Sequence, residues 1–433
     1  MEFDIKFTVI TLGCKVNSFE SEALISYLTN KGWKYTINDK ANVVIINTCT
    51  VTSMSDQKSR QAIRNARKNN ENAIIVAMGC YTQLHSKEAS EIADIIIGTN
   101  NRLEVYNLVN NFIYNKERIN IVDDIFKVNC FEELKVNALT THTRGFIKIQ
   151  DGCENYCSYC AIPYSRGKIR SRNPLFIIDE INTLVESGTK EVIISGINTG
   201  AYGKDLDNMN LAKLIEMIMK NTSIYRIRIS SIELMEITDE LLTIIKKYES
   251  RIANHFHIPA QGGCDSVLER MDRKYRTKEY KDVIKKIRTM FKDVAITTDF
   301  LAGFVGETEE EFELAKDFIK EIGYSNMHIF PYSRRKGTKA DLMKDHLNPK
   351  VQKTRAHELL EIAKEMKKAY ETSFIGKEVV VLVENIKNGY WRGYTSNYLD
   401  VYFKSDENLE NQLVKVIISE YKCEKLYGIR KEK

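Results

Sequence analysis

The chain has 433 residues, of which 43% are hydrophobic and 28% charged, and a formal net charge of +5. This length exceeds one ordinary core and predicts two or three domains, while the composition excludes disordered, collagen-like and coiled-coil chains. No apolar run reaches the length of a membrane helix and the start lacks a secretory signal, so we expect a cytoplasmic protein without a membrane partner. In a reducing cytosol, nine cysteines are more typical of metal ligands, reactive thiols or core residues than of disulfides.

The first third of the chain repeats one unit, an apolar strand with a cysteine at its end and then a helix. We expect strands at Phe7–Leu12, Val43–Ile46 and Ile74–Met78, followed by Cys14, Cys49 and Cys80, with helices at Asp56–Lys68 and Lys87–Ile92. This alternation predicts a parallel sheet, whose functional edge lies at the carboxyl ends of the strands. The three cysteines should therefore come together at one edge.

From about residue 145 the alternation of strands and helices resumes on a larger scale, with helices such as Pro174–Glu186 and Glu309–Ile322. Six strands favour a partial (βα)6 barrel, whose open side can admit a large substrate. The strands are expected at Gly145–Gln150, Glu191–Ser195, Ile224–Ser230, Asn254–Ile258, Ala295–Phe300 and Asn326–Tyr332.

A long helix, Val351–Tyr370, leads into a last segment that reads as short strands with a hairpin turn at Asn388-Gly389. Such a segment predicts a small β-barrel, a fold that commonly binds oligonucleotides. Its strands are expected at Glu378–Glu384, Tyr390–Ser396, Leu399–Phe403 and Leu413–Ser419. The predicted fold class is therefore α/β with a parallel sheet, a partial barrel and a small β-barrel, in domains 1–138, 139–371 and 372–433.

A C-x3-C-x2-C motif, formed by Cys153, Cys157 and Cys160, follows the first strand of the expected barrel. Thiolates are natural ligands of iron-sulfur clusters, and three of them leave one iron of a 4Fe-4S cluster open to a small molecule. Structural zinc sites normally take four ligands, and no fourth cysteine or histidine follows at zinc spacing. Cysteines without any metal are the remaining alternative.

The run QDGCENYCSYCAIPYSRG resembles the radical S-adenosylmethionine signature. The resemblance implies that the open iron binds S-adenosylmethionine and that one-electron reduction yields a 5′-deoxyadenosyl radical. The blocks TLGCKVNSFESE, INTCTV and AMGCYTQ resemble the N-terminal domain of the methylthiotransferases, in which three cysteines hold a second 4Fe-4S cluster. In this chain those ligands would be Cys14, Cys49 and Cys80.

Further segments match the cofactor-binding stretches of the family, and polar strand ends that merely cap the next helix are the alternative. Gly196 could let the backbone meet the amino group of the cofactor because it has no Cβ. The residues expected at the cofactor are Tyr159, Ser195, Gly196, Ser230, Glu233, His257, Gln261, Asp299 and Phe304.

RNA contacts are expected from two regions. The stretch IFPYSRRKGTKA resembles the family's Y-S-x-R-x-G-T-x-A, and the C-terminal segment resembles a TRAM domain, an RNA-binding module. Basic residues suit phosphates and aromatic residues suit stacking on unpaired bases, while solvated charges and core aromatics are the alternatives. The candidates are Arg166, Arg335, Trp391 and Arg392.

The resemblance as a whole implies a tRNA methylthiotransferase, which uses one S-adenosylmethionine to methylate a sulfur on the auxiliary cluster and a second to abstract hydrogen from adenine C2. TLGCKVN and the layout resemble the MtaB branch, which acts on N6-threonylcarbamoyladenosine next to the anticodon. The carboxylate of that nucleoside should meet an arginine, for which Arg335 and Arg166 are the candidates. The implied partners are tRNA, a low-potential electron donor of flavodoxin or ferredoxin type, and a sulfur source.

Three alternatives stay open. The MiaB branch acts on N6-isopentenyladenosine, and its members read closer to T-x-G-C-Q-M-N at the first cysteine. The RimO branch modifies an aspartate of a ribosomal protein. A non-enzymatic iron-sulfur RNA-binding protein comes from a different class, and it would leave the cofactor-binding segments without a purpose.

Overall fold

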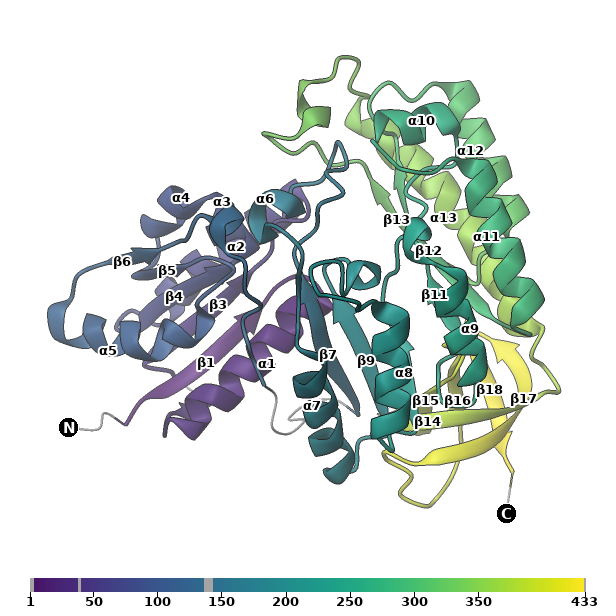
Figure 1. The fold of residues 1–433 in the computed structure, drawn as a ribbon, viewed down its shortest axis with the longest axis horizontal. Helices are drawn as coiled ribbons and strands as arrows, with labels where there is room; N and C mark the ends of the chain where they lie inside the picture. Colours follow the sequence, from purple (N-terminus) through teal and green to yellow (C-terminus); the bar gives the residue numbers. More distant parts are fainter. Residues whose placement is uncertain (1–3, 38–39, 136–142, 432–433) are drawn as a thin grey trace.

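The computed structural model describes residues 4–37, 40–135 and 143–431, which form three modules along the chain (Figure 1). A six-stranded sheet comes first, an arc of parallel strands second and a small closed barrel last. The expected domain boundary at residues 138 and 139 lies outside the described residues. Within the described ranges, no helix combines the length and the apolarity that crossing a membrane requires.

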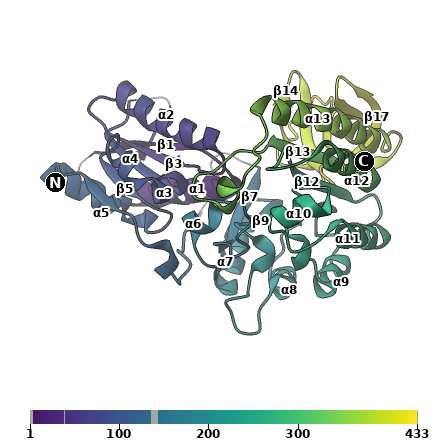
Figure 2. The same cartoon turned by 90° about the horizontal axis from the view of Figure 1, so that it is seen from above.

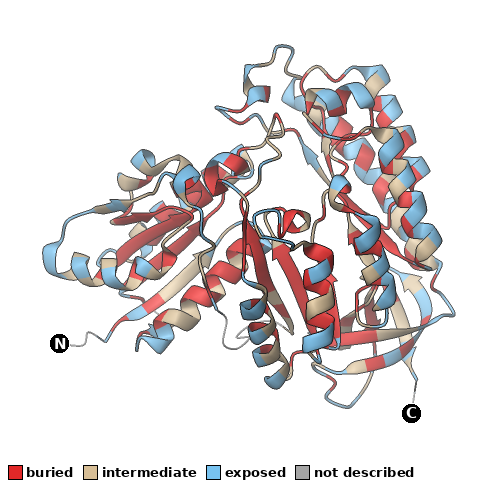
Figure 3. Cartoon of the chain, in the orientation of Figure 1, coloured by how far each residue is buried: buried red, intermediate tan, exposed pale blue. Residues whose placement is uncertain are grey.

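The N-terminal module is a wholly parallel sheet in the order β2-β1-β3-β4-β5-β6. Strands β3 and β4 are buried along their whole length, because helices α1 and α5 cover one face and α2 and α4 the other (Figure 3). The sequence pattern missed β2, β5 and β6, which are only two or three residues long. The elements are β1 Lys6–Thr11, α1 Lys15–Asn30, β2 Lys34–Tyr35, β3 Val43–Thr48, α2 Ser53–Asn69, β4 Ile74–Gly79, α3 Cys80–Leu84, α4 Ser86–Ser90, β5 Ile95–Ile97, α5 Val105–Asn115 and β6 Ile119–Ile121.

The central module places six parallel strands in the order β7, β9, β10, β11, β12 and β13, which confirms the partial barrel. Bridges at Ile227–Ile252 and Ser231–His257 connect its two sheets between β10 and β11. The helices pack outside the strands and share one hydrophobic core with them. The elements are β7 Arg144–Asp151, α6 Ile162–Arg166, β8 Arg170–Ser171, α7 Pro174–Glu186, β9 Glu191–Gly196, α8 Leu211–Asn221, β10 Arg226–Ile229, α9 Asp239–Lys247, β11 His255–His257, α10 Asp265–Arg270, α11 Thr277–Met290, β12 Ala295–Ala302, α12 Glu309–Ile322, β13 Asn326–Pro331 and α13 Pro349–Thr372.

The C-terminal module is a closed five-stranded barrel in the order β14-β15-β16-β18-β17. Asn388 and Gly389 both have positive φ angles, 52° and 78°, and join β14 to β15 as the expected hairpin turn. The sequence pattern missed the last strand. The elements are β14 Glu378–Lys387, β15 Tyr390–Thr395, β16 Asp400–Phe403, β17 Leu413–Lys422 and β18 Lys425–Arg430.

The small barrel docks on the amino-terminal ends of the central strands. Arg228 of β10 donates to the carbonyls of Thr395 and Ser396 at 3.0 and 2.9 Å, and Arg226 donates to that of Tyr394 at 3.3 Å. Glu191 of β9 is buried between the two arginines and forms ion pairs with both. The C-terminal module therefore closes one end of the partial barrel and leaves the carboxyl ends of its strands on the opposite side.

Candidate active site

Cys14, Cys49 and Cys80 lie at the carboxyl ends of three neighbouring strands, as the sequence pattern predicted. Cys14 precedes α1, Cys49 follows β3, and Cys80 is the first residue of α3 after β4. A Cβ placed on Gly13 would stand 2.9 Å from the sulfur of Cys49, so the loop that carries Cys14 lies directly against Cys49. Burial raises the pKa values of Cys14 and Cys49 most, and the nearby Cys80 raises them further. The three thiols therefore form one group.

A glycine precedes both Cys14 and Cys80, and the backbone requires it. Gly13 and Gly79 each have a φ of +104°, a conformation that residues with a side chain rarely adopt. A Cβ on Gly79 would also stand 2.6 Å from the side-chain oxygen of Asn47. The two Gly-Cys pairs in the sequence are thus the sharp turns that bring the cysteines to the sheet edge.

Arg166, on the short helix α6 that follows the second cysteine motif, reaches into this group. Its Nε donates to the sulfur of Cys80 at 3.1 Å, and its other nitrogens bond Asn17 at 2.9 Å, Glu20 at 2.5 Å and Asp151 at 3.2 Å. The side chain is fully buried. This corrects the expectation that Arg166 meets RNA phosphates or a substrate carboxylate, because its donors are occupied within the protein.

Helix α6 of the second module packs against α3 of the first (Figure 2). A buried charge network surrounds Arg166 of α6. Glu20 of α1 forms ion pairs with Arg102 at 2.9 Å, Arg166 at 2.5 Å and Lys148 at 2.7 Å. Burial by itself would raise the pKa of Glu20, but the three cations together lower it to about 2. Glu20 is therefore ionised at neutral pH and fixes α1 against β7.

Cys153, Cys157 and Cys160 lie on the loop between β7 and α6, which backbone contacts hold in shape. Gly152 has a φ of +79°, and a Cβ there would stand 1.8 Å from the carbonyl oxygen of Lys168. Cys153 donates its N–H to the carbonyl of Gly167 at 3.0 Å, and Cys160 donates to that of Cys157 at 3.0 Å. The three thiols are thus presented by a pre-formed loop.

The chemistry of these thiols fits a metal group. Burial, with a further contribution from the neighbouring Cys157, raises the pKa values of Cys153 and Cys160 to about 12. A bound cation is needed to stabilise three adjacent thiolates, and metal binding releases their protons. In the described part of the chain, no three His, Cys, Asp or Glu side chains converge closely enough to hold one ion. A four-iron cluster is larger than an ion and takes one thiolate per iron, which suits each triad.

Arg273 contacts a sulfur of the second triad, as Arg166 contacts one of the first, and no pattern in the sequence predicted this. Its guanidinium donates to the sulfur of Cys157 at 3.3 Å and forms an ion pair with Glu233. It is buried and also bonds the hydroxyl of Tyr275 at 3.0 Å. Glu233, an expected cofactor residue, is thereby placed beside the cysteine loop. No motif in the sequence links these positions, which lie on different strand-helix connections.

Tyr159 stands on the cysteine loop after β7, and the other residues expected at the cofactor lie toward the carboxyl ends of β9 to β12. Gly196 ends β9, and a Cβ there would stand 2.9 Å from Gln150 Oε1. The Tyr159 ring packs edge-on against Phe304, with 6.2 Å between centroids. Ser195 precedes Gly196 in β9, and the hydroxyl of Ser230 lies 3.0 Å from that of Thr199. His257 lies 3.4 Å from Asp299. Gln261 has a φ of +60° and donates its N–H to the carbonyl of Asp299. Their individual contacts with the cofactor stay predictions.

The remaining RNA candidates are occupied by contacts within the protein. Arg335 is buried and bonds Asp56 at 2.6 Å and Thr50 at 2.7 Å, joining the central module to the first. Trp391 is buried in the core of the small barrel and donates to the carbonyl of Ser405 at 3.2 Å. Arg392 is half-buried and pairs with Asp400 at 2.8 Å. These positions correct the expectation of free RNA contacts at Arg335 and Trp391, and they show Arg392 held by a carboxylate.

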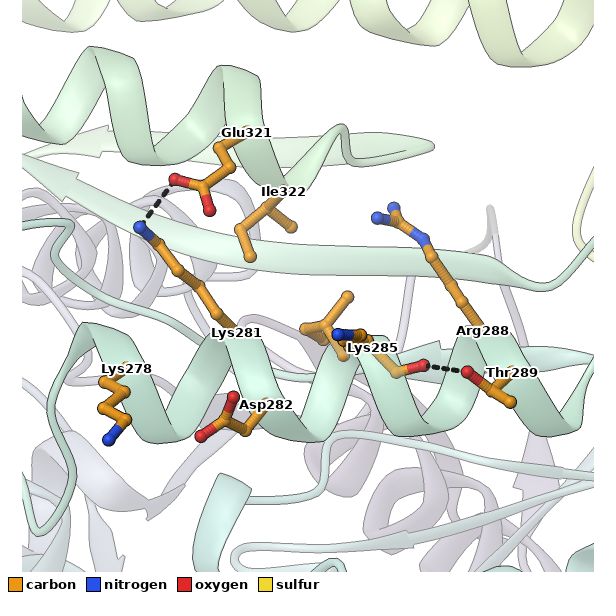
Figure 4. A pocket seen from close by; sticks show the side chains of 9 residues that line it. Lys278, Lys281, Asp282, Lys285, Arg288, Thr289, Glu321 and Ile322 are labelled. Carbon is orange, nitrogen blue, oxygen red and sulfur yellow. Dashed lines mark hydrogen bonds and ion pairs between the residues drawn. The ribbon is translucent and has the colours of Figure 1, made fainter.

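One hollow of the surface lies away from these residues, between α11 and α12 on the outside of the central module (Figure 4). It has a volume of about 510 Å³, and four of its nine lining residues are basic, Lys278, Lys281, Lys285 and Arg288. Lys281 is already paired with Glu321 at 2.6 Å. None of the expected site residues lines this hollow.

Two solved structures share the fold. The radical S-adenosylmethionine methyltransferase TsrM from Kitasatospora setae, with cobalamin and a 4Fe-4S cluster bound, matches with a TM-score of 0.56 at 12% identity, covering 76% of this chain and 75% of that chain. The cobalamin-dependent S-adenosylmethionine radical enzyme OxsB matches with a TM-score of 0.53 at 12% identity, covering 82% and 56%. At such identities the likeness concerns the fold.

Sequence relatives are much closer. Residues 147–319 match the model of the radical SAM superfamily, and residues 6–98 that of the uncharacterized protein family UPF0004. Threonylcarbamoyladenosine tRNA methylthiotransferase MtaB of Bacillus subtilis is 40% identical, covering 94% of this chain and 92% of the relative. MtaB of Aquifex aeolicus is 35% identical (96% and 100%), and tRNA-2-methylthio-N(6)-dimethylallyladenosine synthase of Thermoanaerobacter pseudethanolicus is 33% identical (98% and 92%). The chain therefore belongs to the methylthiotransferase family of radical S-adenosylmethionine enzymes.

Proposed function

We propose that this protein converts N6-threonylcarbamoyladenosine next to the anticodon of tRNA into its 2-methylthio derivative. The observation that carries this proposal is the joining of the two cysteine triads, since Arg166 follows the second triad in the chain and bonds Cys80 of the first. Sulfur insertion requires a radical site and a sulfur-bearing site that act on one carbon atom. The shared buried network supports such an arrangement.

The residues of the chain divide this work. Cys14, Cys49 and Cys80 hold the auxiliary 4Fe-4S cluster, and Cys153, Cys157 and Cys160 hold the one that binds S-adenosylmethionine. When bound, these groups supply the sulfur and the one-electron cleavage of the cofactor. Arg166 and Arg273 each donate a hydrogen bond to one cysteine sulfur, in the first and the second triad respectively, and so fix the position of that sulfur. The polar strand ends orient the cofactor beside the second triad.

Identity to two MtaB proteins over more than nine-tenths of this chain supports the threonylcarbamoyl substrate. The second candidate is N6-dimethylallyladenosine, because synthases named for that nucleoside are 33% identical over nearly the whole chain. The two nucleosides differ at the N6 group, which carries a carboxylate in the first and is uncharged in the second.

The small barrel offers a different RNA surface from the one expected. Tyr390, Tyr402 and Tyr427 form a ring cluster with centroids 5.3 and 5.8 Å apart, and Lys404 and Lys425 lie over two of these rings. Aromatic faces beside lysines suit unpaired bases and phosphates. We assign the tRNA contact of this module to these five residues, which we call the aromatic-basic surface. Action on tRNA supports the proposal that the protein works in the cytoplasm, with a flavodoxin- or ferredoxin-type reductant and a separate sulfur source.

Nucleoside mass spectrometry of tRNA from a strain that lacks this protein, before and after complementation, tests the function. Restored 2-methylthio-N6-threonylcarbamoyladenosine is the expected result. Restoration of the dimethylallyl derivative instead would move the protein to the second candidate. Unchanged tRNA would refute both and point to the ribosomal-protein branch or to a non-enzymatic role.

A further inference from the structure

Asn17 ends the TLGCKVN block of the sequence and is buried in the first turn of α1, three residues after Cys14. Its side-chain Nδ2 donates to the carbonyl of Leu12 at 2.7 Å and to that of Thr48 at 3.0 Å. Leu12 lies two residues before Cys14, and Thr48 directly precedes Cys49. One buried amide group therefore joins the loops that carry two of the three cysteines of the first triad.

The other end of the same amide is bonded to the second module. Oδ1 of Asn17 accepts a hydrogen bond from Nη2 of Arg166 at 2.9 Å, and it lies 3.9 Å from the sulfur of Cys14. Nε of Arg166 in turn donates to the sulfur of Cys80 at 3.1 Å. The two side chains form one chain of hydrogen bonds, which we call the Asn17–Arg166 bridge. It contacts the loops of all three cysteines of the first triad.

The bridge is anchored in both modules. Asn47 of β3 donates to the backbone carbonyl of Asn17 at 3.0 Å, and Arg166 forms ion pairs with Glu20 of α1 and with Asp151 at the end of β7. All of these side chains are buried, so water does not compete for their hydrogen bonds. A polar group that is held in this way from several sides keeps its own position and that of the groups it contacts.

The contact of Arg166 with Cys80 has an electrostatic consequence. A hydrogen bond to a sulfur of an iron-sulfur cluster stabilises the reduced, more negative form and so raises the reduction potential. Arg166 places such a donor, with a full positive charge, in a buried site, where electrostatic interactions are stronger than in water. Arg170 is buried in the same network, 3.7 Å from Asp151, but its Nη1 donates to the backbone carbonyls of residues 166 and 168.

We propose that Asn17 and Arg166 are positioning residues of the auxiliary cluster. The Asn17–Arg166 bridge sets the spacing of the three cysteine loops, and the hydrogen bond of Arg166 to Cys80 raises the reduction potential of the group that these loops hold. The inference rests on the proposed assignment of the auxiliary cluster to Cys14, Cys49 and Cys80. It adds that a residue of the second module sets a property of the cluster in the first.

The main test measures reduction potentials by EPR-monitored redox titration of full-length protein with both clusters reconstituted. Added S-adenosylmethionine identifies the signals, because it alters only the cluster that binds it. Arg166→Lys keeps a cation beside Glu20 and Asp151, but its single nitrogen cannot also contact Cys80 and Asn17. In this variant the potential of the auxiliary cluster should fall, and that of the other cluster should stay at the wild-type value.

The matched control is Arg170→Gln, which removes a buried positive charge from the same network without removing a contact to a sulfur. It should shift the auxiliary potential less than the charge-conserving Arg166→Lys does. Equal auxiliary potentials in the wild type and in Arg166→Lys, with equal iron content, overturn the inference. A shift in Arg170→Gln as large as that in Arg166→Lys also overturns it, because that result marks the overall charge and not the hydrogen bond.

A second variant, Asn17→Ala, tests the spacing of the loops and decides the matter if Arg166→Lys does not take up the auxiliary cluster. It should lose the iron of that cluster to a chelator about 10 to 100 times faster than the wild type, the range by which loss of a group that supports metal ligands weakens metal binding. Iron loss at the wild-type rate overturns the inference. Failure of the proposed ligand assignment shows differently, as wild-type protein that takes up about four irons and not eight.

Discussion

Replacement of Glu191 by glutamine should destabilise the protein and loosen its C-terminal barrel. Glu191 is fully buried and forms ion pairs with Arg226 and Arg228, the two residues that bond residues 394–396 at the end of β15 in the small barrel. Burial alone would raise the pKa of Glu191, but the two arginines lower it from 4.5 to about 2, which corresponds to roughly 3 kcal/mol of stability at neutral pH. Removal of one partner of a buried pair costs about 3 to 5 kcal/mol, in agreement with that figure.

The assay uses the two tryptophans of the chain, Trp33 in the first module and Trp391 in the small barrel. In a Trp33→Phe background, the fluorescence of Trp391 reports unfolding of the small barrel in urea at pH 7, and limited proteolysis between α13 and β14 reports its release. Glu216→Gln is the control, because Glu216 pairs with Lys247 at the surface, where such pairs contribute about 1 kcal/mol or less. If Glu191→Gln lowers the urea midpoint no more than Glu216→Gln does, the buried network does not hold the module, and the reasoning is refuted.

Three further predictions follow from the site and the fold. Anaerobic reconstitution should give about eight irons per chain, and alanine at Cys153, Cys157 and Cys160 should halve that number, whereas undiminished iron would refute the assignment of ligands. The pKa of Glu191 is lower in the folded than in the unfolded protein, so its contribution to the free energy of unfolding is present above about pH 4.5 and is lost as the pH falls toward 2. The urea midpoint of the wild type should therefore fall over that range more steeply than that of Glu191→Gln. Alanine at Lys404 and Lys425 should weaken tRNA binding and reduce its salt dependence, since each phosphate contact with a single strand contributes about 0.7 to the slope of log K against log salt. An unchanged slope would remove the aromatic-basic surface from the tRNA interface.

Local patterns predicted the architecture because strand and helix periodicities reflect which side chains face the core. The Gly-Cys pairs at Gly13 and Gly79 are local in the same sense, since each turn depends on one backbone angle. The strands β2, β5 and β6 were not predicted, because two or three residues are too few to show the alternating pattern of a strand. Even so, the parallel order of the sheet followed from the long strands alone.

The partners of charged residues were not predictable from local patterns. Arg166 and Arg335 resemble RNA contacts in the sequence because they stand in basic runs. In the structure each is buried against an acid more than a hundred positions away, Glu20 and Asp56 respectively. Only the packing of the first module on the second brings such residues together. The burial of Trp391 was not predicted for a related reason, since an aromatic residue that faces the core and one that faces solvent have the same sequence context on a short strand.

The pairing of each cysteine triad with one buried arginine follows from the same electrostatics. Three thiolates with no positive charge nearby repel one another, and burial raises their pKa values further, as for Cys153 and Cys160. Arg166 and Arg273 each place a guanidinium against one sulfur, and each is in turn held by a carboxylate, Glu20 or Glu233. The carboxylate fixes the arginine, and the arginine holds one sulfur of the triad in place for a metal group. Both triads thus have one buried arginine against one sulfur. The arginine at the first triad comes from the second module, so the surroundings of Cys80 are complete only when the two modules are packed together.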